Sequence, residues 1–434
     1  MFYSHLACLD DLSRDAYWPA KEFMYDLIRV PLYHATGVDL GKSPRRGQRH
    51  NLHPDFDVAQ FLQRCGAGPG DDAWVALYQG IPAEAADYLN RHVPEGTLVI
   101  GYEMPPWLRK ALDQGGHAWL DMRLSPLRFA SDLYLAMATN RADLYARLLP
   151  HAQRMDEVFS EAALMAAQVR YRQRYEPTPA VFAERLWVYV GQTEADASLI
   201  TPQGGFARIG EHAANLRQVV GQDKVVYKAH PLDQGFAAAE HMALERILGR
   251  AVGICKAETY ELMAGEWPVR FVGLSSGVLQ EAQWFGKEAL PLLPPICQPA
   301  FQPEHNPEAY LQIASHTFLS EPLWAAVANP EAPRAQPLLH PPRANHLREL
   351  HNTWWGYASH TARHSDFYRQ LFALHGAPQA KPVNNDGLRD ALGQAHQQID
   401  TLRQEVDGLK DALRVLMRQT AARPDRHNRL RQHG

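Results

Sequence analysis

The sequence predicts an α/β protein with two Rossmann-type domains that face a cleft, followed by a C-terminal coiled-coil helix. First, short apolar runs alternate with amphipathic stretches from about residue 74 to residue 300, which is typical of parallel βαβ units. Second, Pro177 and Pro179 separate two such regions. Third, residues 388–416 carry an apolar heptad pattern. A length of 434 residues fits two domains and an appendage better than one core.

The first domain is expected over residues 1–180. Two apolar runs predict strands, Trp74–Tyr78 and Thr97–Tyr102. Stretches with helical periodicity are Ala83–His92, Pro106–Asp113, Pro126–Ala138 and Arg141–Arg174.

The second domain is expected over residues 181–335. Its predicted strands are Leu186–Val190, Val225–Tyr227, Ala251–Cys255 and Val269–Val272. Its predicted helices are Ala207–Val220, Gly235–Leu248, Glu258–Ala264 and Val278–Phe285. The proline-rich stretch 330–342 predicts a crossing linker, and residues 336–380 a helical segment that returns to the first domain.

Composition narrows the class of protein. An apolar fraction of 46% and a charged fraction of 21% describe an ordinary globular chain. A net charge of −4 provides no basic field for a nucleic-acid partner. The cysteines lie far apart without a C-x-x-C motif, which fits a reducing cytoplasm. The N-terminus lacks a signal-peptide pattern, and no apolar run is long enough to span a membrane.

Three polar segments each follow a predicted strand of the second domain. They contain Gln192, Asp196 and Ser198; Lys228, His230 and Pro231; and Ser275, Ser276 and Gly277. Carboxyl ends of parallel strands share the sheet edge at which ligands bind. A carboxylate, a Lys/His pair and a double serine at that edge indicate chemistry on a phosphorylated donor.

Each segment also has an alternative structural interpretation. Asp196 is either a helix cap or a carboxylate aimed at an anomeric carbon. Lys228 and His230 point to one side of a strand end. They are either a solvated lysine with a core histidine, or the groups that neutralise a departing phosphate. Ser275 and Ser276 cap a helix, bind phosphate at its N-terminus, or do both.

Together, Q-x-x-x-D-x-S, K-x-H-P and the double serine resemble the bacterial capsule and lipopolysaccharide synthesis family. The likeness is greatest to its retaining β-Kdo transferases and covers about residues 95–290. It implies a GT-B-like fold and CMP-β-Kdo as donor, with Asp196 as nucleophile. His230 and Lys228 would then stabilise the CMP phosphate, while Gln192 and Ser198 orient the nucleophile or the sugar. The expected product is a β-linked Kdo on O-antigen or capsule polysaccharide.

Two other functions stay open. The H-P and S-S elements are shared with bacterial sialyltransferases, so an inverting sialyl- or nonulosonate transferase is one alternative. A non-catalytic glycan-assembly scaffold, in which the coiled coil is the working part, is the other.

The first domain offers further candidates. Glu103 ends a strand before a helix that begins with proline, so it either stabilises the helix dipole or acts as a general base for the acceptor hydroxyl. Asp121, Arg123 and Arg128 lie in a segment that resembles one in the same family. An arginine fork there would match the C1 carboxylate of Kdo, or it would form a structural Asp–Arg pair.

Neither a metal nor a cofactor is expected, since the CMP-sugar is a substrate. Asp55-Phe56-Asp57 has the D-x-D form, but it opens the predicted helix Val58–Cys65 and is better suited to capping. The 21 histidines show no metal-ligand spacing.

Apolar residues in the tail alternate at spacings of four and three, which predicts a coiled coil over residues 385–420. The seam consists of Leu388, Leu392, Ala395, Ile399, Leu402, Val406, Leu409, Leu413 and Leu416. Its expected partner is a second copy of the chain or an enzyme of the same pathway. We therefore expect a cytoplasmic protein, peripherally associated with glycan synthesis at the inner face of the inner membrane.

Overall fold

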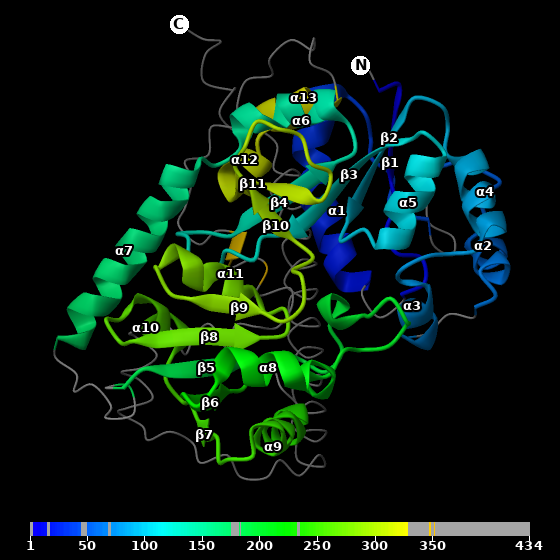
Figure 1. Ribbon diagram of the computed structural model, residues 1–434. Helices are drawn as coiled ribbons and strands as arrows, with labels where there is room; N and C mark the ends of the chain where they lie inside the picture. Colours follow the sequence, from blue (N-terminus) through cyan, green and yellow to red (C-terminus); the bar gives the residue numbers. More distant parts are fainter. Residues whose placement is uncertain are drawn as a thin grey trace, which may run out of the picture. The chain divides into compact units, whose positions relative to one another are not determined.

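The computed structural model describes residues 3–14, 18–44, 50–67, 71–174, 182, 184–231, 235–328, 347–348 and 351. All of them belong to one compact unit, Met1–Thr361. The expected coiled coil over residues 385–420 and the proline-rich stretch 330–342 lie outside the described residues, as does most of the expected returning segment 336–380. The described part contains two β-sheets flanked by helices (Figure 1).

The first sheet has six strands, and all of them except β4 run in the same direction. Its order is β1 (His5–Cys8), β2 (Thr97–Tyr102), β3 (Ala118–Leu124), β4 (Tyr134–Thr139), β11 (Ala309–Ala314) and β10 (Gln298–Ala300). Strands β1, β2 and β3 run parallel, whereas β4 is antiparallel to both of its neighbours. The carboxyl ends of β1 to β3 therefore share one edge.

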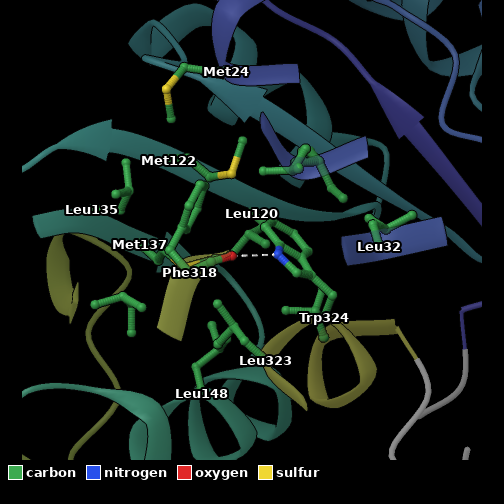
Figure 2. Packing of buried hydrophobic residues seen from close by; sticks show 14 of the residues in the cluster. Met24, Leu32, Leu120, Met122, Leu135, Met137, Leu148, Phe318, Leu323 and Trp324 are labelled. Atoms are coloured by element: carbon green, nitrogen blue, oxygen red, sulfur yellow. Dashed lines mark hydrogen bonds between the residues drawn. The ribbon is translucent and has the colours of Figure 1, made fainter. Parts of the chain in front are cut away.

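Helices cover both faces of this first sheet. One face packs against α1 (Trp18–Thr36), α6 (Ala142–Leu148), α12 (Ser315–Phe318) and α13 (Glu321–Ala328). Figure 2 shows this core, where the indole of the buried Trp324 donates a 2.7 Å hydrogen bond to the Phe318 carbonyl. The other face packs against α2 (Val58–Arg64), α4 (Ala83–His92) and α5 (Pro106–Gln114).

The second sheet is parallel throughout. Its order is β7 (Gly253–Ile254), β6 (Lys224–Lys228), β5 (Leu186–Val190), β8 (Val269–Gly273) and β9 (Ala289–Pro291). One face is covered by α8 (Ala213–Val220) and α9 (Phe236–Leu248), the other by α10 (Thr259–Ala264) and α11 (Gly277–Trp284). The chain adds strands outward from β5 on one side and then returns to add β8 on the other. The strand order therefore reverses between β5 and β8, where such sheets bind ligands.

Three of the elements that the sequence predicts for the lobe built on the first sheet differ in the structure, and the elements β1, α1, β3, β10 and β11 of this lobe were not predicted at all. Trp74–Tyr78, expected as a strand, lies mostly within helix α3 (Asp71–Leu77). Pro126–Ala138, expected as a helix, is an irregular segment followed by β4. The expected helix Arg141–Arg174 is interrupted between α6 and α7 (Met155–Gln173) by a short 3₁₀ turn, Leu149–His151.

Domain boundaries also differ from the expectation. We expected residues 181–335 to form the second domain, but β10 and β11 pair within the first sheet. The chain therefore returns to the first lobe near residue 298, before the proline-rich stretch. Leu347 is fully buried in the core of the first lobe, and the backbone N–H groups of Leu347 and Arg348 donate to the Asp132 carboxylate at 2.9 Å.

The two lobes contact each other through the segment before β4. The Arg128 N–H donates to Glu281 Oε1 on α11 at 2.6 Å, and the Tyr260 hydroxyl donates to the same oxygen at 2.9 Å. Burial, opposed by these hydrogen bonds, raises the pKa of Glu281 to about 7. No helix within the described ranges is both long and apolar enough to cross a bilayer.

Candidate active site at the ends of strands β5 and β8

The switch point is the place between β5 and β8 where the strand order of the second sheet reverses. Side chains that follow these two strands form one hydrogen-bond network. Gln192 Oε1 accepts from the Ser275 backbone N–H at 2.8 Å, and its Nε2 donates to the hydroxyls of Ser198 and Ser275 at 3.2 and 3.3 Å. The Ser275 hydroxyl donates to Ser198 Oγ at 2.7 Å, and the Ser198 hydroxyl donates to Asp196 Oδ1 at 2.7 Å. The structure thus brings together four residues that the sequence singled out.

Asp196 has the capping role that was one of the two interpretations left open by the sequence. It is the N-cap of a 3₁₀ turn, Ala197–Leu199, and its Oδ1 also accepts from the Ser198 N–H at 2.8 Å. Both bonds from Ser198 end on Oδ1, so they fix the orientation of the carboxylate while engaging a single oxygen. The residue is half-buried. The hydrogen bonds from Ser198 thus limit the orientations that this carboxylate can adopt.

A close approach of three elements explains the glycine that follows β5. A Cβ atom at Gly191 would lie 2.6 Å from the Tyr227 hydroxyl and 2.9 Å from Glu240 Oε2. Glu240 is buried and accepts hydrogen bonds from the hydroxyls of Tyr189 and Tyr227, at 3.0 and 2.9 Å. This packing fixes the strand end from which Gln192 projects.

Strand register brings the segment with Lys228 and His230 to the same edge of the sheet. Val190 pairs with Lys228 on one side and with Gly273 on the other, so the three motifs leave the sheet side by side. The Lys228 ammonium donates to the Ala257 carbonyl at 2.8 Å. His230 is half-buried two residues beyond the strand.

The double serine lies where β8 turns into α11. Ser275 and Ser276 are both buried. Ser276 occupies the N-cap position of α11, but its side chain makes no capping hydrogen bond. The first turn of a helix presents N–H groups that have no partner within the helix, and these groups bind anions. The serine pair is therefore a suitable position for phosphate oxygens.

Glu103 approaches this site from the first lobe. Among the described residues it is the only one other than glycine with a positive φ, 54°. Burial raises the pKa of Glu103, the positive charges of Arg123 and Arg14 lower it, and the negative charge of Asp196 raises it. The charge effect of Asp196 means that the two carboxylates, from different sheets, lie within electrostatic reach.

Asp121 and Arg123 form the structural ion pair that was one of two expectations. Arg123 Nε donates to Asp121 Oδ2 at 2.9 Å and to the Tyr310 hydroxyl oxygen at 3.0 Å, and Nη2 donates to the Met104 carbonyl at 2.7 Å. Because protein groups occupy the Nε–Nη2 edge of the guanidinium, we do not retain the expected fork for a sugar carboxylate. Arg128 is half-buried, and its charge acts on Glu281 and Cys297.

Several groups around Glu103 were not expected from the sequence. Asp11 and Arg14 follow the unexpected strand β1, and the Arg14 guanidinium lies 3.6 Å from the ring centroid of Trp74. Burial raises the pKa of Tyr78 to about 12, and the charges of Glu103, Asp11 and Asp121 also act on its hydroxyl. The sequence signal for Asp11 and Arg14 was the short apolar run Leu6–Leu9, which is followed by Asp10 and Asp11.

The D-x-D segment has the structural role that the sequence favoured. Asp57 is the N-cap of α2 and accepts from the Gln60 N–H at 2.9 Å. In the portion of the chain with described coordinates, no three His, Cys, Asp or Glu side chains form a group able to hold a metal ion.

No protein-family model matches the chain, and no curated protein matches it. Nineteen chains of solved structures are similar to it, among them two from Thermosulfurimonas dismutans. One is the β-Kdo 2,7-transferase of KpsC from Thermosulfurimonas dismutans, with 14% identity, a TM-score of 0.29, and coverage of 57% of this chain and 80% of that chain. The other is the β-Kdo 2,4-transferase of the same KpsC, with 16% identity, a TM-score of 0.28, and coverage of 64% and 88%.

Proposed function

We propose that the protein is a retaining glycosyltransferase that moves Kdo from CMP-β-Kdo to a bacterial surface polysaccharide. The sequence motifs suggest the donor class, and the setting of Asp196 supports the reaction class. A retaining transfer needs a nucleophile held close to the anomeric carbon, on the face opposite the leaving phosphate. It also needs a base that activates the acceptor hydroxyl. Asp196 and Glu103 are the two carboxylates suited to these roles.

In the first step a carboxylate oxygen of Asp196 forms a bond to the anomeric carbon of Kdo. The bond from that carbon to the phosphate oxygen breaks, and its electron pair leaves with CMP. Lys228, His230 and the N-terminal turn of α11 at Ser276 stabilise the charge on the departing phosphate. The sugar is then held as an ester of Asp196.

In the second step Glu103 accepts the proton of an acceptor hydroxyl. The resulting oxygen attacks the anomeric carbon, and the ester bond to Asp196 breaks with its electron pair returning to the carboxylate. Two displacements restore the original anomeric configuration. A raised pKa suits Glu103 to this role, because a base works best when its pKa lies near the operating pH.

The observation that carries the proposal is the hydrogen-bond chain from Ser275 through Ser198 to Asp196 Oδ1 at the switch point of the second sheet. It places an oriented carboxylate where a parallel sheet binds its ligand. A helix cap alone does not need two serines and a glutamine from two strands.

The test is incubation with CMP-Kdo and a panel of acceptor glycans, with and without EDTA. We expect CMP release and a β-linked Kdo product, unaffected by the chelator. Mass spectrometry of the protein with donor alone should find one Kdo added on the peptide that contains Asp196. A product of inverted configuration without this adduct would indicate the inverting alternative. No transfer from any CMP-activated acid sugar would reject the proposal.

A further inference from the structure

We propose that Tyr310, Asp121 and Arg123 are positioning residues, which hold the Glu103–Met104 peptide in the conformation that the transfer reaction requires. This inference rests on the proposed role of Glu103 as the base. It assigns to Asp121 and Arg123 a function other than binding substrate. It adds Tyr310, which lies 189 positions after Asp121 in the chain.

The first observation is the backbone of Glu103. A φ of 54° lies in the left-handed region, which is unfavourable for a residue with a side chain. Such a conformation persists only when surrounding contacts impose it. Glu103 directly follows β2, where its N–H donates to the Met122 carbonyl at 2.8 Å.

The second observation is a clamp on the next residue. The Met104 N–H donates to Asp121 Oδ1 at 2.9 Å, and the Met104 carbonyl accepts from Arg123 Nη2 at 2.7 Å. Both polar groups of Met104 are therefore held by one ion pair on the neighbouring strand β3. This fixes the chain immediately after the left-handed residue.

The third observation is the anchor of the clamp. The Tyr310 hydroxyl, from β11, donates to Asp121 Oδ2 at 2.7 Å and accepts from Arg123 Nε at 3.0 Å. Asp121 and Tyr310 are fully buried. The ion pair thus needs Tyr310 to satisfy its remaining polar groups, since a buried charge without partners is costly.

Burial also distinguishes positioning from substrate binding. The side chain of Arg123 is 8% exposed and that of Asp121 is not exposed at all. Their bonds go to Met104, to Tyr310 and to each other. They therefore act on the reaction through Glu103, which is half-buried and subject to the charge of Asp196.

Replacement of Tyr310 by Phe tests the anchor with little change in shape. Y310F removes one donor to Asp121 and one acceptor of Arg123, which loosens the Met104 clamp. We expect kcat for Kdo transfer to fall about 10- to 100-fold, with KM for CMP-Kdo little changed, because small misplacements of a catalytic group have effects of this size. Burial raises the pKa of Glu103. If Y310F lets water reach the Glu103 carboxylate, this pKa should fall, and the acidic limb of the pH profile of kcat should move to lower pH.

Y145F is the matched control. The Tyr145 hydroxyl donates a 2.6 Å bond to the Gln302 carbonyl within the same lobe, outside the clamp. It should leave kcat and the pH profile unchanged. In a double-mutant cycle, Y310F should have no further effect on kcat once Glu103 is replaced by Gln, because the two changes act through one group.

Amide hydrogen exchange tests the clamp without relying on activity. The Met104 amide should exchange at least about tenfold faster in Y310F than in wild type, with no change in Y145F. R123K keeps the positive charge but loses the paired guanidinium N–H donors, so it should also speed exchange at Met104. It replaces Y310F in this test if Y310F does not fold. Unchanged exchange at Met104 in the variants would overturn positioning, even in a protein that transfers Kdo. If the variants exchange faster at Met104 but the wild-type protein has no transferase activity, the proposed function is rejected. The inference that these residues hold the Glu103–Met104 peptide would still stand.

Discussion

Glu103 and Asp196 belong to different sheets, yet the negative charge of Asp196 contributes to raising the pKa of Glu103. Two carboxylates within electrostatic reach resist ionising together. Burial is the main cause that raises the pKa of Glu103, and the charge of Asp196 adds to it. Asp196, in contrast, accepts two hydrogen bonds from Ser198 on Oδ1. This difference in surroundings underlies the separate roles assigned to them.

Replacing Asp196 by Asn should reduce Kdo transfer at least about 10³-fold, because the amide lacks the nucleophilic oxygen while its carbonyl still accepts from Ser198. The measurement is CMP release under saturating donor. D57N is the control, since Asp57 also caps a helical turn but lies at α2, away from the site. Equal activity of D196N and D57N would contradict a chemical role for Asp196.

Glycine at position 103 should make the fold more stable than alanine does. Gly tolerates the φ of 54° without the penalty of roughly 1–2 kcal/mol that a Cβ incurs in the left-handed region. Urea denaturation of E103G and E103A measures the difference. The same pair of substitutions at exposed Asp87, within α4, should give the opposite order, with glycine less stable by about 1 kcal/mol. An E103G protein less stable than E103A would contradict strain at this position.

Burial of Glu281 where the two lobes meet should make the stability of the fold depend on pH. The pKa of Glu281 is about 7 in the folded protein, above the usual 4.5, so the folded state binds the proton more tightly. Its stabilisation is fully present below pH 4.5 and is lost as the pH rises towards 7, by on the order of 3 kcal/mol. E281Q, which mimics the protonated form, should gain relative to wild type over this range. Denaturant midpoints at pH 5 and pH 7.5 test this; a constant difference would contradict it.

The coiled coil over residues 385–420 stays a prediction from the heptad pattern. Truncation after Pro382 should preserve turnover on small soluble acceptors and shift the protein to a smaller oligomer in sedimentation.

A truncation before Leu347 should behave differently from the truncation after Pro382, because Leu347 is buried in the first lobe and its N–H donates to the Asp132 carboxylate. Loss of the Leu347 side chain alone should lower the free energy of unfolding by about 2–5 kcal/mol. Sedimentation of the Pro382 truncation as the full-length species would reject self-association through the seam.

The inner strands β6, β5 and β8 of the second sheet were predictable because they are short, apolar and mostly buried on both faces, whereas the edge strand β9 was not expected. Leu186–Val190 has the bounds expected from the sequence, and Gln192 and Ser275 meet because parallel strands end at one edge. The motifs that carry the chemistry lie on these strands. Local patterns were sufficient for these strands, even though β8 pairs with β5 and not with β7, the strand that precedes it along the chain.

The first lobe was harder because long-range pairing decides its structure. Tyr134–Thr139 contains Leu, Ala and Met, which favour helix, but antiparallel neighbours on both sides make it a strand. Tyr310 completes the Asp121 ion pair from 189 positions away. No local spacing indicates such a partner, and for the same reason the two interpretations of Arg123 could not be distinguished.

Insertion of β11 between β4 and β10 affects the order in which a nascent chain can fold. The strands of the second sheet come from one continuous stretch, Leu186–Pro291, and are all synthesised before β11. The first sheet, although it begins at His5, lacks an inner strand until residue 314 has left the ribosome. The lobe nearest the N-terminus should therefore be the last to close, which reverses the usual N-to-C order of co-translational folding. An expressed fragment that ends near residue 180 would lack Tyr310, and with it the partner of its own buried ion pair.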